Sequence, residues 1–207
     1  MINNNKLCYN EIYKGNNMIE YDSLMIKGSL DRYLKIMEFA KTSPDISKDR
    51  EFQKTFNGFY IAGPKSQLWY QQFYELFQEA REHKYDFKTV LFKLYDTTGR
   101  VELSFCSKMI HTLNPQKPII DQYILWKLGF NTKINFSDNP DLAVSVYDDI
   151  CKQYNEHMND DSVVEVLKRF DNEFPQYANI EKIKKLDTIF WSRREFRIHS
   201  VFEYEAK

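Results

Sequence analysis

The chain has 207 residues, of which 43% are hydrophobic and 16% aromatic, so it can form one large domain or two small lobes. Its 29 basic and 30 acidic residues give a formal net charge of −1, which excludes a general attraction to nucleic acid and leaves that role to local basic patches. With only 6 glycines and 6 prolines, the composition favours helices over a strand-and-turn architecture.

The cysteines and the first residues bear on compartment and cofactors. Cys8, Cys106 and Cys151 lie far apart and form no Cys-x-x-Cys pair, which argues against a disulfide framework, a zinc site or an iron–sulfur cluster on four cysteines. The opening stretch MINNNKLCYNEIYKGNN is polar without an apolar signal region, and no window approaches membrane-spanning length. We therefore expect a cytoplasmic monomer without a metal, a cofactor or contact with a membrane.

Apolar residues recur at helical spacing along most of the chain, so the sequence predicts an all-α protein. Residues 1–27, which are rich in asparagine and weakly patterned, are expected to be irregular. The predicted helices cover residues 28–41, 47–56, 65–83, 86–96, 101–113, 121–129, 141–157, 161–171 and 179–193. Residues 56–64 and 131–140 are expected to be connections, and the end of the chain a short extended piece.

Several residues mark the ends and faces of these helices. Ser29 and Asp86 are placed to cap helix N-termini, and Gly129 is placed to cap a C-terminus. The Asn114-Pro115 pair ends the helix that precedes it. The apolar face predicted for residues 65–83 contains Leu68, Trp69, Phe73, Leu76 and Phe77.

The stretch PIIDQYILWKLG, residues 118–129, raises the functional question. Asp121 stands at the start of an otherwise apolar helix, at or next to its N-cap. Backbone N–H groups and the helix dipole hold a carboxylate ionised at such a position. Asp121 is therefore either a helix cap only or an acid placed for chemistry.

Residues 101–129 resemble the helix-hairpin-helix DNA glycosylase superfamily. PIIDQYILWKLG is similar to a segment of the form P-V-D-T-H-V-x-R-V-x-x-R-L-G, with Asp121 and the final basic-Leu-Gly matching in type. The preceding SFCSKMIHTLNP is similar to the helix S-F-A-S-K-L-L-H-x-x-N-P of a divergent, 8-oxoguanine-glycosylase-like branch. The resemblance implies one unit over residues 1–207, built as two helical lobes with a cleft between them. The hairpin, the helix after it and the aspartate then occupy residues 97–129.

The resemblance also implies an activity. In that superfamily a base is flipped out of DNA and its N-glycosidic bond is cleaved, so we expect a DNA glycosylase that removes a modified or damaged base and leaves an abasic site. Asp121 is then the catalytic residue, because a fixed carboxylate stabilises the oxocarbenium ion that develops on the sugar or activates the attacking water. Tyr123 and Trp126 are candidates for the base pocket, and the alternative is that both belong to the core.

One helix face before Asp121 carries polar residues. Ser104, Ser107, Lys108 and His111 fall at i, i+3, i+4 and i+7. We expect this face either to line the cleft and contact DNA or to be a solvated surface. Bifunctional members of the superfamily have a catalytic lysine near the position of Ser104, so the resemblance implies a monofunctional, hydrolytic enzyme. Lys108, one helical turn later, is the candidate if an amine nucleophile is used.

Further DNA contacts are expected at the hairpin and near the end of the chain. The superfamily's hairpin binds a phosphate through a glycine-rich turn, whereas TTGRVEL here has only Gly99, beside which Arg100 can bind phosphate through its side chain. Residues 182–197 contain six basic and two acidic residues, a net charge of +4 that either contacts DNA or is a solvated face. The candidates there for contact with the DNA backbone are Lys185, Arg193 and Arg194.

The reduced hairpin supports the first of two other hypotheses, and the divergence from the motifs of repair enzymes supports the second. In the first, the chain is a non-catalytic module on the same scaffold that binds DNA or a protein partner, and Asp121 serves only as a cap. In the second, the chain is a specialised defence enzyme that attacks hypermodified bases of invading viral DNA.

Overall fold

The computed structural model describes residues 23–60, 63–128, 136 and 138–192. Within these residues every regular element is a helix and none is a strand, which confirms the prediction of an all-α protein. The elements are α2 (Ser23–Thr42), α3 (Arg50–Tyr60), α4 (Gln67–His83), α5 (Phe87–Thr98), α6 (Leu103–Leu113), α7 (Gln122–Lys127), α8 (Pro140–His157), α9 (Asp161–Glu173), the 3-10 helix η1 (Pro175–Tyr177) and α10 (Lys182–Ser192).

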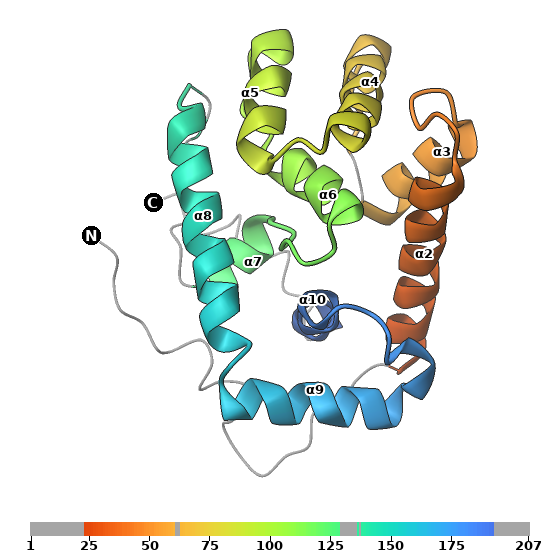
Figure 1. The fold of residues 1–207 in the computed structure, drawn as a ribbon, viewed down its shortest axis with the longest axis vertical. Coiled ribbons are helices and arrows are strands. Elements are labelled where there is room, and N and C mark those ends of the chain that lie inside the picture. The colour runs from red at the N-terminus through yellow and green to blue at the C-terminus, as the bar shows by residue number, and fades with distance from the viewer. Residues whose placement is uncertain (1–22, 61–62, 129–135, 137, 193–207) are drawn as a thin grey trace, which may run out of the picture.

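Helix α10 occupies the middle of the molecule. It is seen end-on in Figure 1, with α2, α7, α8 and α9 surrounding it in that view. It packs against α2 and α9, and the Tyr123 hydroxyl of α7 donates a hydrogen bond to the Phe190 carbonyl of α10 at 2.9 Å. As a result all residues from 183 to 190 are buried. A helix enclosed in this way must be apolar or must pair its charges inside the protein, and α10 does the latter.

Helices α3 and α4 enclose an aromatic core. Phe52, Phe56, Phe73 and Phe77 are each 0% exposed. The rings of Phe56 and Phe77 meet edge to face, with centroids 5.5 Å apart. Burial of each such side chain contributes about 1.5–3 kcal/mol, and the edge-to-face geometry adds to it. This cluster gives the N-terminal half of the described chain a rigid, filled interior.

The buried face of α4 differs from the prediction at one position. Trp69, Phe73, Leu76 and Phe77 are buried as predicted, but Leu68 is 62% exposed. Leu68 precedes Phe73 by five residues, which places it roughly 140° around the helix from that ring. The helical period therefore turns Leu68 away from the core.

Helices α2 and α3 extend by four or more residues beyond their predicted ends. Helix α2 begins before residue 28, because Ile26 and Leu30, one turn apart, are both buried and continue its apolar stripe. Ser29 consequently lies inside the helix and does not cap it. Helix α3 continues through residues 56–60, which were expected to be part of a connection. The rings of Phe56 and Tyr60 pack one turn apart there, with centroids 4.7 Å apart.

The ends of α5 and α6 agree with the predicted signals. Asp86 caps α5 by accepting a hydrogen bond from the Thr89 N–H at 2.8 Å. Gly99 ends α5 with a φ of 66°, a left-handed conformation that glycine adopts without steric cost. Asn114 ends α6. Residues 1–27 were expected to be irregular, but residues 23–27 belong to α2, so that part of the prediction is wrong. Gly129, residues 1–22 and residues 193–207, for which a C-cap, irregular structure and an extended piece were expected, lie outside the described residues.

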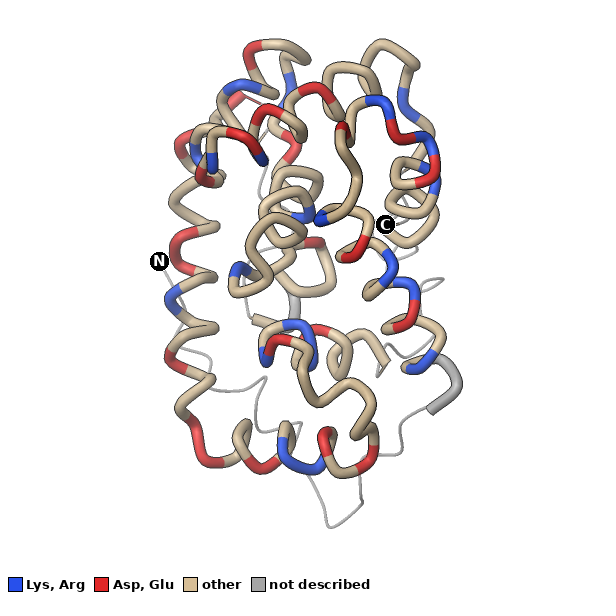
Figure 2. Tube along the Cα trace, turned by 45° about the vertical axis from the view of Figure 1, so that its right-hand side comes forward, with Lys and Arg blue, Asp and Glu red and all other residues tan. Residues whose placement is uncertain are grey.

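Charges of both signs are distributed over the surface. Figure 2 shows acidic and basic positions interspersed along the peripheral helices. The ion pair of Arg169 with Glu165, 2.6 Å long on α9, is exposed on both sides, so it contributes little to stability. None of the described helices combines the length and the apolarity that crossing a bilayer requires.

Candidate active site

A buried serine fixes the segment that leads to Asp121. The Ser107 Oγ accepts a hydrogen bond from the Ile120 N–H at 2.9 Å and lies 3.0 Å from the Ser104 carbonyl oxygen, to which it donates. Ile119 and Ile120 are themselves 4% and 0% exposed. The two isoleucines therefore anchor the chain in the core immediately before Asp121, while Ser107 satisfies a backbone group that burial would leave unpaired.

His111 holds the same connection nearer to its start. Its Nδ1 lies 2.6 Å from the Lys117 carbonyl oxygen and its Nε2 3.1 Å from the Tyr33 hydroxyl. A carbonyl can only accept, so Nδ1 carries the proton and Nε2 accepts from Tyr33. Burial, together with the charge of Lys184, lowers the pKa of His111 to about 4. The ring is therefore neutral near pH 7 and joins α6, α2 and the α6–α7 connection.

These contacts correct two sequence predictions. Ser107 and His111 are both 0% exposed and bonded within the protein, so neither side chain is on the surface where DNA could contact it. The other two members of the predicted polar face, Ser104 and Lys108, do line a cavity below Asp121. The helix face that carries these four residues has two different environments. One half opens to the cavity, and the other half packs against the α6–α7 connection and α2.

Asp121 stands at the N-terminus of α7, as predicted. Its Oδ1 accepts a hydrogen bond from the Ile124 N–H at 2.9 Å, which is the geometry of an N-cap. The pKa of Asp121 is nevertheless raised, because burial penalises the carboxylate and Asp187 adds a like charge. The capping bond and Lys108 oppose this shift without cancelling it. The expected stabilisation of the ionised form by the helix terminus is therefore present but is outweighed.

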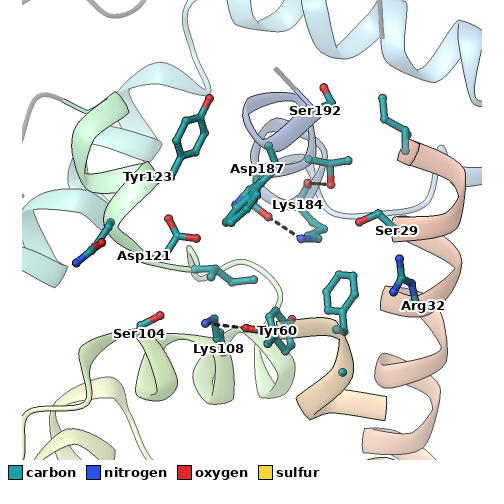
Figure 3. Close-up of a pocket in the computed structure, with 17 residues that line it drawn as sticks. Ser29, Arg32, Tyr60, Ser104, Lys108, Asp121, Tyr123, Lys184, Asp187 and Ser192 are labelled. Atoms are coloured by element: carbon teal, nitrogen blue, oxygen red, sulfur yellow. Dashed lines mark hydrogen bonds and ion pairs between the residues drawn. The ribbon is translucent and has the colours of Figure 1, made fainter. Parts of the chain in front are cut away.

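A cavity of about 640 Å³ opens beside Asp121 between α2, α3, α6, α7 and α10. This volume lies within the range of pockets that bind small organic molecules. Its charged wall groups are Arg32, Lys108, Asp121, Lys184 and Asp187. Figure 3 shows Asp121 entering from α7 and Lys108 from α6 below it, while Lys184 and Asp187 enter from α10. Residues from helices distant in sequence thus converge on one space.

The amine of Lys108 lies in a desolvated part of the cavity wall. Its Nζ donates to the Tyr60 carbonyl at 3.4 Å and lies over the rings of Tyr60 and Phe105, 5.7 and 5.5 Å from their centroids. Burial lowers the pKa of Lys108, while the charges of Asp121 and Asp187 raise it in part. A lowered pKa increases the fraction of neutral amine, which is the form that acts as a nucleophile or a base.

A buried ion pair on α10 was not predicted. The Lys184 Nζ lies 2.5 Å from the Asp187 Oδ2, and the two side chains are only 5% and 4% exposed. The ammonium also lies over the rings of Tyr33 and Phe59, 5.2 and 5.4 Å from their centroids. The available signal was two opposite charges at i and i+3 inside the apolar stretch IKKLDTIFW, a spacing at which charges meet on one helix face.

Of the other residues predicted to contact DNA, some are exposed, one is buried, and two lie outside the described part of the chain. Gly99 and Arg100 are exposed at the turn between α5 and α6. Lys185 is 3% exposed and bonds to the Asp171 carboxylate at 2.5 Å and the Ala178 carbonyl at 2.7 Å, so its ammonium is not on the surface where DNA could contact it. The reason is the central position of α10, which buries consecutive residues. Arg193 and Arg194 lie outside the described residues.

The cavity has aromatic walls, only some of which were predicted. Tyr123 lines it, but its hydroxyl is bonded to the Phe190 carbonyl of α10. Trp191 also lines the cavity, with its ring 5.7 Å from that of Tyr123. Phe59 and Tyr60 are further aromatic lining residues that the sequence did not indicate. The side chain of Trp126, the other predicted base-pocket residue, lies outside the described part of the structure.

Comparison with known proteins adds no assignment. A scan against protein-family models and searches of curated proteins and of solved structures found no match to the chain. The described residues also contain no group of three or more His, Cys, Asp or Glu side chains placed to bind a metal ion. The function must therefore be argued from the cavity and its residues.

Proposed function

We propose that the chain is a DNA N-glycosylase that acts as a monomer and has the two-lobed helix-hairpin-helix glycosylase fold. The observation that carries the proposal is that Asp121 and Lys108 enter one cavity of about 640 Å³ with Phe59, Tyr60 and Trp191 in its walls. The volume is sufficient for a nucleobase, and aromatic walls suit a flat ring. The resemblance of PIIDQYILWKLG and SFCSKMIHTLNP to the glycosylase superfamily supports the same hypothesis.

In the proposed reaction the base leaves the DNA stack and enters the cavity. The bond between the sugar C1′ and the base nitrogen breaks, and its electron pair leaves with the base, which takes up a proton. Positive charge develops on the sugar, where the Asp121 carboxylate stabilises it. A water adds to C1′ and gives its proton to Asp121, so that an abasic sugar remains. A raised pKa suits this step, because a carboxylate of higher pKa is a stronger base.

The turn between α5 and α6 is the proposed phosphate contact. Gly99 and Arg100 are exposed there, and α6 begins only three residues later with Leu103. The guanidinium of Arg100 can donate to a phosphate, in place of the additional glycine N–H groups of the superfamily's hairpin. Ser104 follows on α6 and lines the cavity. A DNA strand bound at this turn would therefore pass close to the cavity that Ser104 and Asp121 line.

Lys108 provides a second mechanism for the same activity. Its position in the cavity and its lowered pKa favour attack of the amine on C1′, which expels the base. The C1′–O4′ bond of the sugar then breaks, O4′ takes up a proton, and a Schiff base between protein and sugar remains. Borohydride reduces such an intermediate to a stable protein–DNA adduct. We propose hydrolysis as the principal route. An adduct that forms with wild type and not with Lys108→Met would instead assign the chemistry to the lysine.

The activity is tested with duplex and single-stranded DNAs that carry different modified bases, including hypermodified bases of viral DNA, scored for strand breaks in alkali. We expect abasic product from at least one DNA, and loss of that product in Asp121→Asn. The matched control is Asp86→Asn, since Asp86 caps α5 through the same bond to an N–H three residues on but lies on the surface. Asp86→Asn should retain full activity.

Two outcomes would contradict this proposal. If wild type yields no abasic product from any DNA, the chain is a binding module on the same scaffold and Asp121 is a cap. If Asp121→Asn and Asp86→Asn are equally active, base release occurs without the proposed carboxylate.

A further inference from the structure

The wall of the cavity on α10 contains a carboxylate oxygen without a partner. Asp187 is 3% exposed and lines the cavity, and its Oδ2 is bonded to the Lys184 Nζ at 2.5 Å. Its Oδ1 is buried and has no hydrogen-bond partner among the described residues. Buried polar atoms are nearly always bonded, so an unbonded oxygen of a charged group in a cavity wall requires an explanation.

A purely structural ion pair does not explain it, as the neighbouring pair on the same helix shows. Lys185 is also buried and bonds to the Asp171 carboxylate at 2.5 Å, but the Asp171 side chain is 38% exposed, so water reaches it. Lys185 donates in addition to the Ala178 carbonyl. In that pair the requirements of both partners are met. In the Lys184–Asp187 pair the Oδ1 of Asp187 remains without a hydrogen-bond partner, and Asp187 lines the cavity.

The surroundings hold this oxygen in place. The Lys184 ammonium lies over the rings of Tyr33 and Phe59, at 5.2 and 5.4 Å from their centroids, and it binds the other oxygen of Asp187. Figure 3 shows the pair on the α10 side of the cavity, apart from Asp121 and Lys108 on α7 and α6. Asp187 is thus a pre-oriented acceptor on a different wall from the proposed reacting groups.

We infer that Asp187 is a recognition residue, whose Oδ1 accepts a hydrogen bond from an N–H group on the edge of the bound nucleobase. A carboxylate only accepts, so it favours bases that offer an amino group or a protonated ring nitrogen at that position and disfavours bases that offer a lone pair. This inference rests on the proposed function, since it assumes that a base occupies the cavity. Lys184 is then a positioning residue that orients the carboxylate.

The first test uses the wild-type protein and free bases. The probes are 1-methyluracil, 1-methylcytosine, 9-methyladenine and 9-methylhypoxanthine, whose methyl groups stand where the sugar would be attached. Each is compared with its analogue in which every remaining N–H is methylated, by calorimetry and thermal shift. We expect at least one N–H base to bind about 10- to 100-fold more tightly than its methylated analogue, the range for a hydrogen bond to a charged group. Equal binding, or binding of none, overturns the inference.

The second test uses paired variants that leave no buried charge unpaired. Lys184→Met/Asp187→Leu removes the pair and should lose the preference for the N–H base. Lys184→Met/Asp187→Asn keeps an oxygen that accepts and should retain part of it. The control Lys185→Met/Asp171→Leu neutralises the neighbouring pair and should leave the preference within about twofold, since neither residue lines the cavity. An unchanged preference in Lys184→Met/Asp187→Leu would contradict the role of Asp187.

The two proposals fail in different ways. If the wild type binds an N–H base in the cavity but cleaves no DNA, the proposed glycosylase activity is wrong and the role of Asp187 in recognition is supported. If wild type cleaves DNA and Lys184→Met/Asp187→Leu cleaves the same bases with the same relative kcat/KM, the glycosylase stands and the inference about Asp187 is wrong.

Discussion

The aromatic core between α3 and α4 and the cavity between α6, α7 and α10 use buried residues in opposite ways. In the core, Phe52, Phe56 and Phe77 are 0% exposed, and the rings of Phe52 and Phe56 meet that of Phe77 edge to face. In the cavity wall, Asp121 and Lys108 are desolvated, with pKa values raised and lowered respectively. The core is built from groups that burial favours, and the cavity from groups that burial penalises.

This difference indicates where stability and function reside in the molecule. Groups whose burial is unfavourable often serve binding or catalysis, for which the protein gives up some stability. Clusters of titratable residues with shifted pKa values are typical of active sites. The rigid core therefore supports α6 through the stacking of α4, α5 and α6, while the cavity residues carry the specific chemistry. Substitutions in the two regions should separate stability from activity.

The largest effect on stability is expected in the core. Phe56→Ala should lower the free energy of unfolding by about 3–5 kcal/mol, because it removes a ring that packs against Tyr60, Phe73 and Phe77 and leaves a cavity. Unfolding in urea, followed by circular dichroism, measures this change. A loss below about 1 kcal/mol would mean that the cluster is not the stable centre of the fold.

A pH-dependent loss of similar size is expected from His111. Its pKa is about 4 in the folded state and 6.5 in the unfolded chain, so the unfolded chain binds the proton first as the pH falls. Stability from this residue is complete above pH 6.5 and declines toward pH 4, by roughly 3 kcal/mol in total. Urea unfolding at pH 7 and pH 4.5 should show a smaller difference for His111→Gln than for wild type. The exposed His83→Gln should match wild type.

A smaller effect is expected from Ser107. Ser107→Ala leaves the buried Ile120 N–H without its acceptor, which costs about 1–3 kcal/mol. It should also lower the rate of base release, because the segment before Asp121 loses an anchor. The control is Thr97→Ala, which removes an exposed bond to the Lys93 carbonyl and should change stability by less than about 0.5 kcal/mol. Equal effects of the two variants would show that Ser107 has no special role.

The smallest expected effect is the difference in stability between variants of two helix caps, Asp86 and Asp121. Asp86→Ala removes the cap of α5 and should cost about 1 kcal/mol. Asp121→Ala removes an equivalent cap but also relieves a desolvated carboxylate, so it should cost less than Asp86→Ala. Thermal melts of the two variants measure the difference. If Asp121→Ala costs clearly more, Asp121 is mainly a structural residue.

The sequence predicted what depends on local signals. The cap Asp86, the end of α6 at Asn114, and the placement of Lys108 and Asp121 at one cavity follow from short-range spacing or from the resemblance. These features were read correctly because a cap or a helix face is determined within a few residues. The sequence therefore predicted one part of the candidate site, namely that Lys108 and Asp121 line the same cavity.

The features set by long-range packing could not be read in this way. Lys185 looked like part of a basic surface because nothing in IKKLDTIFW indicates that other helices surround α10. The spacing of Lys184 and Asp187 indicates that they can pair, but only the surrounding helices determine that the pair is buried. Ser107 and His111 share a polar stripe with Lys108, and only the path of the α6–α7 connection decides that they are covered.

The most direct measurement for the whole account is the single-turnover rate of base release by Asp121→Asn on the best DNA substrate, with its melting temperature determined alongside. Asparagine keeps an oxygen that can cap α7 and removes the penalised charge, so the protein should melt at or above the wild-type temperature. Base release should fall at least about 100-fold, the usual loss when one positioned acid–base group is removed. A variant that releases base at the wild-type rate, or that loses activity only because it unfolds, would contradict the catalytic role of Asp121.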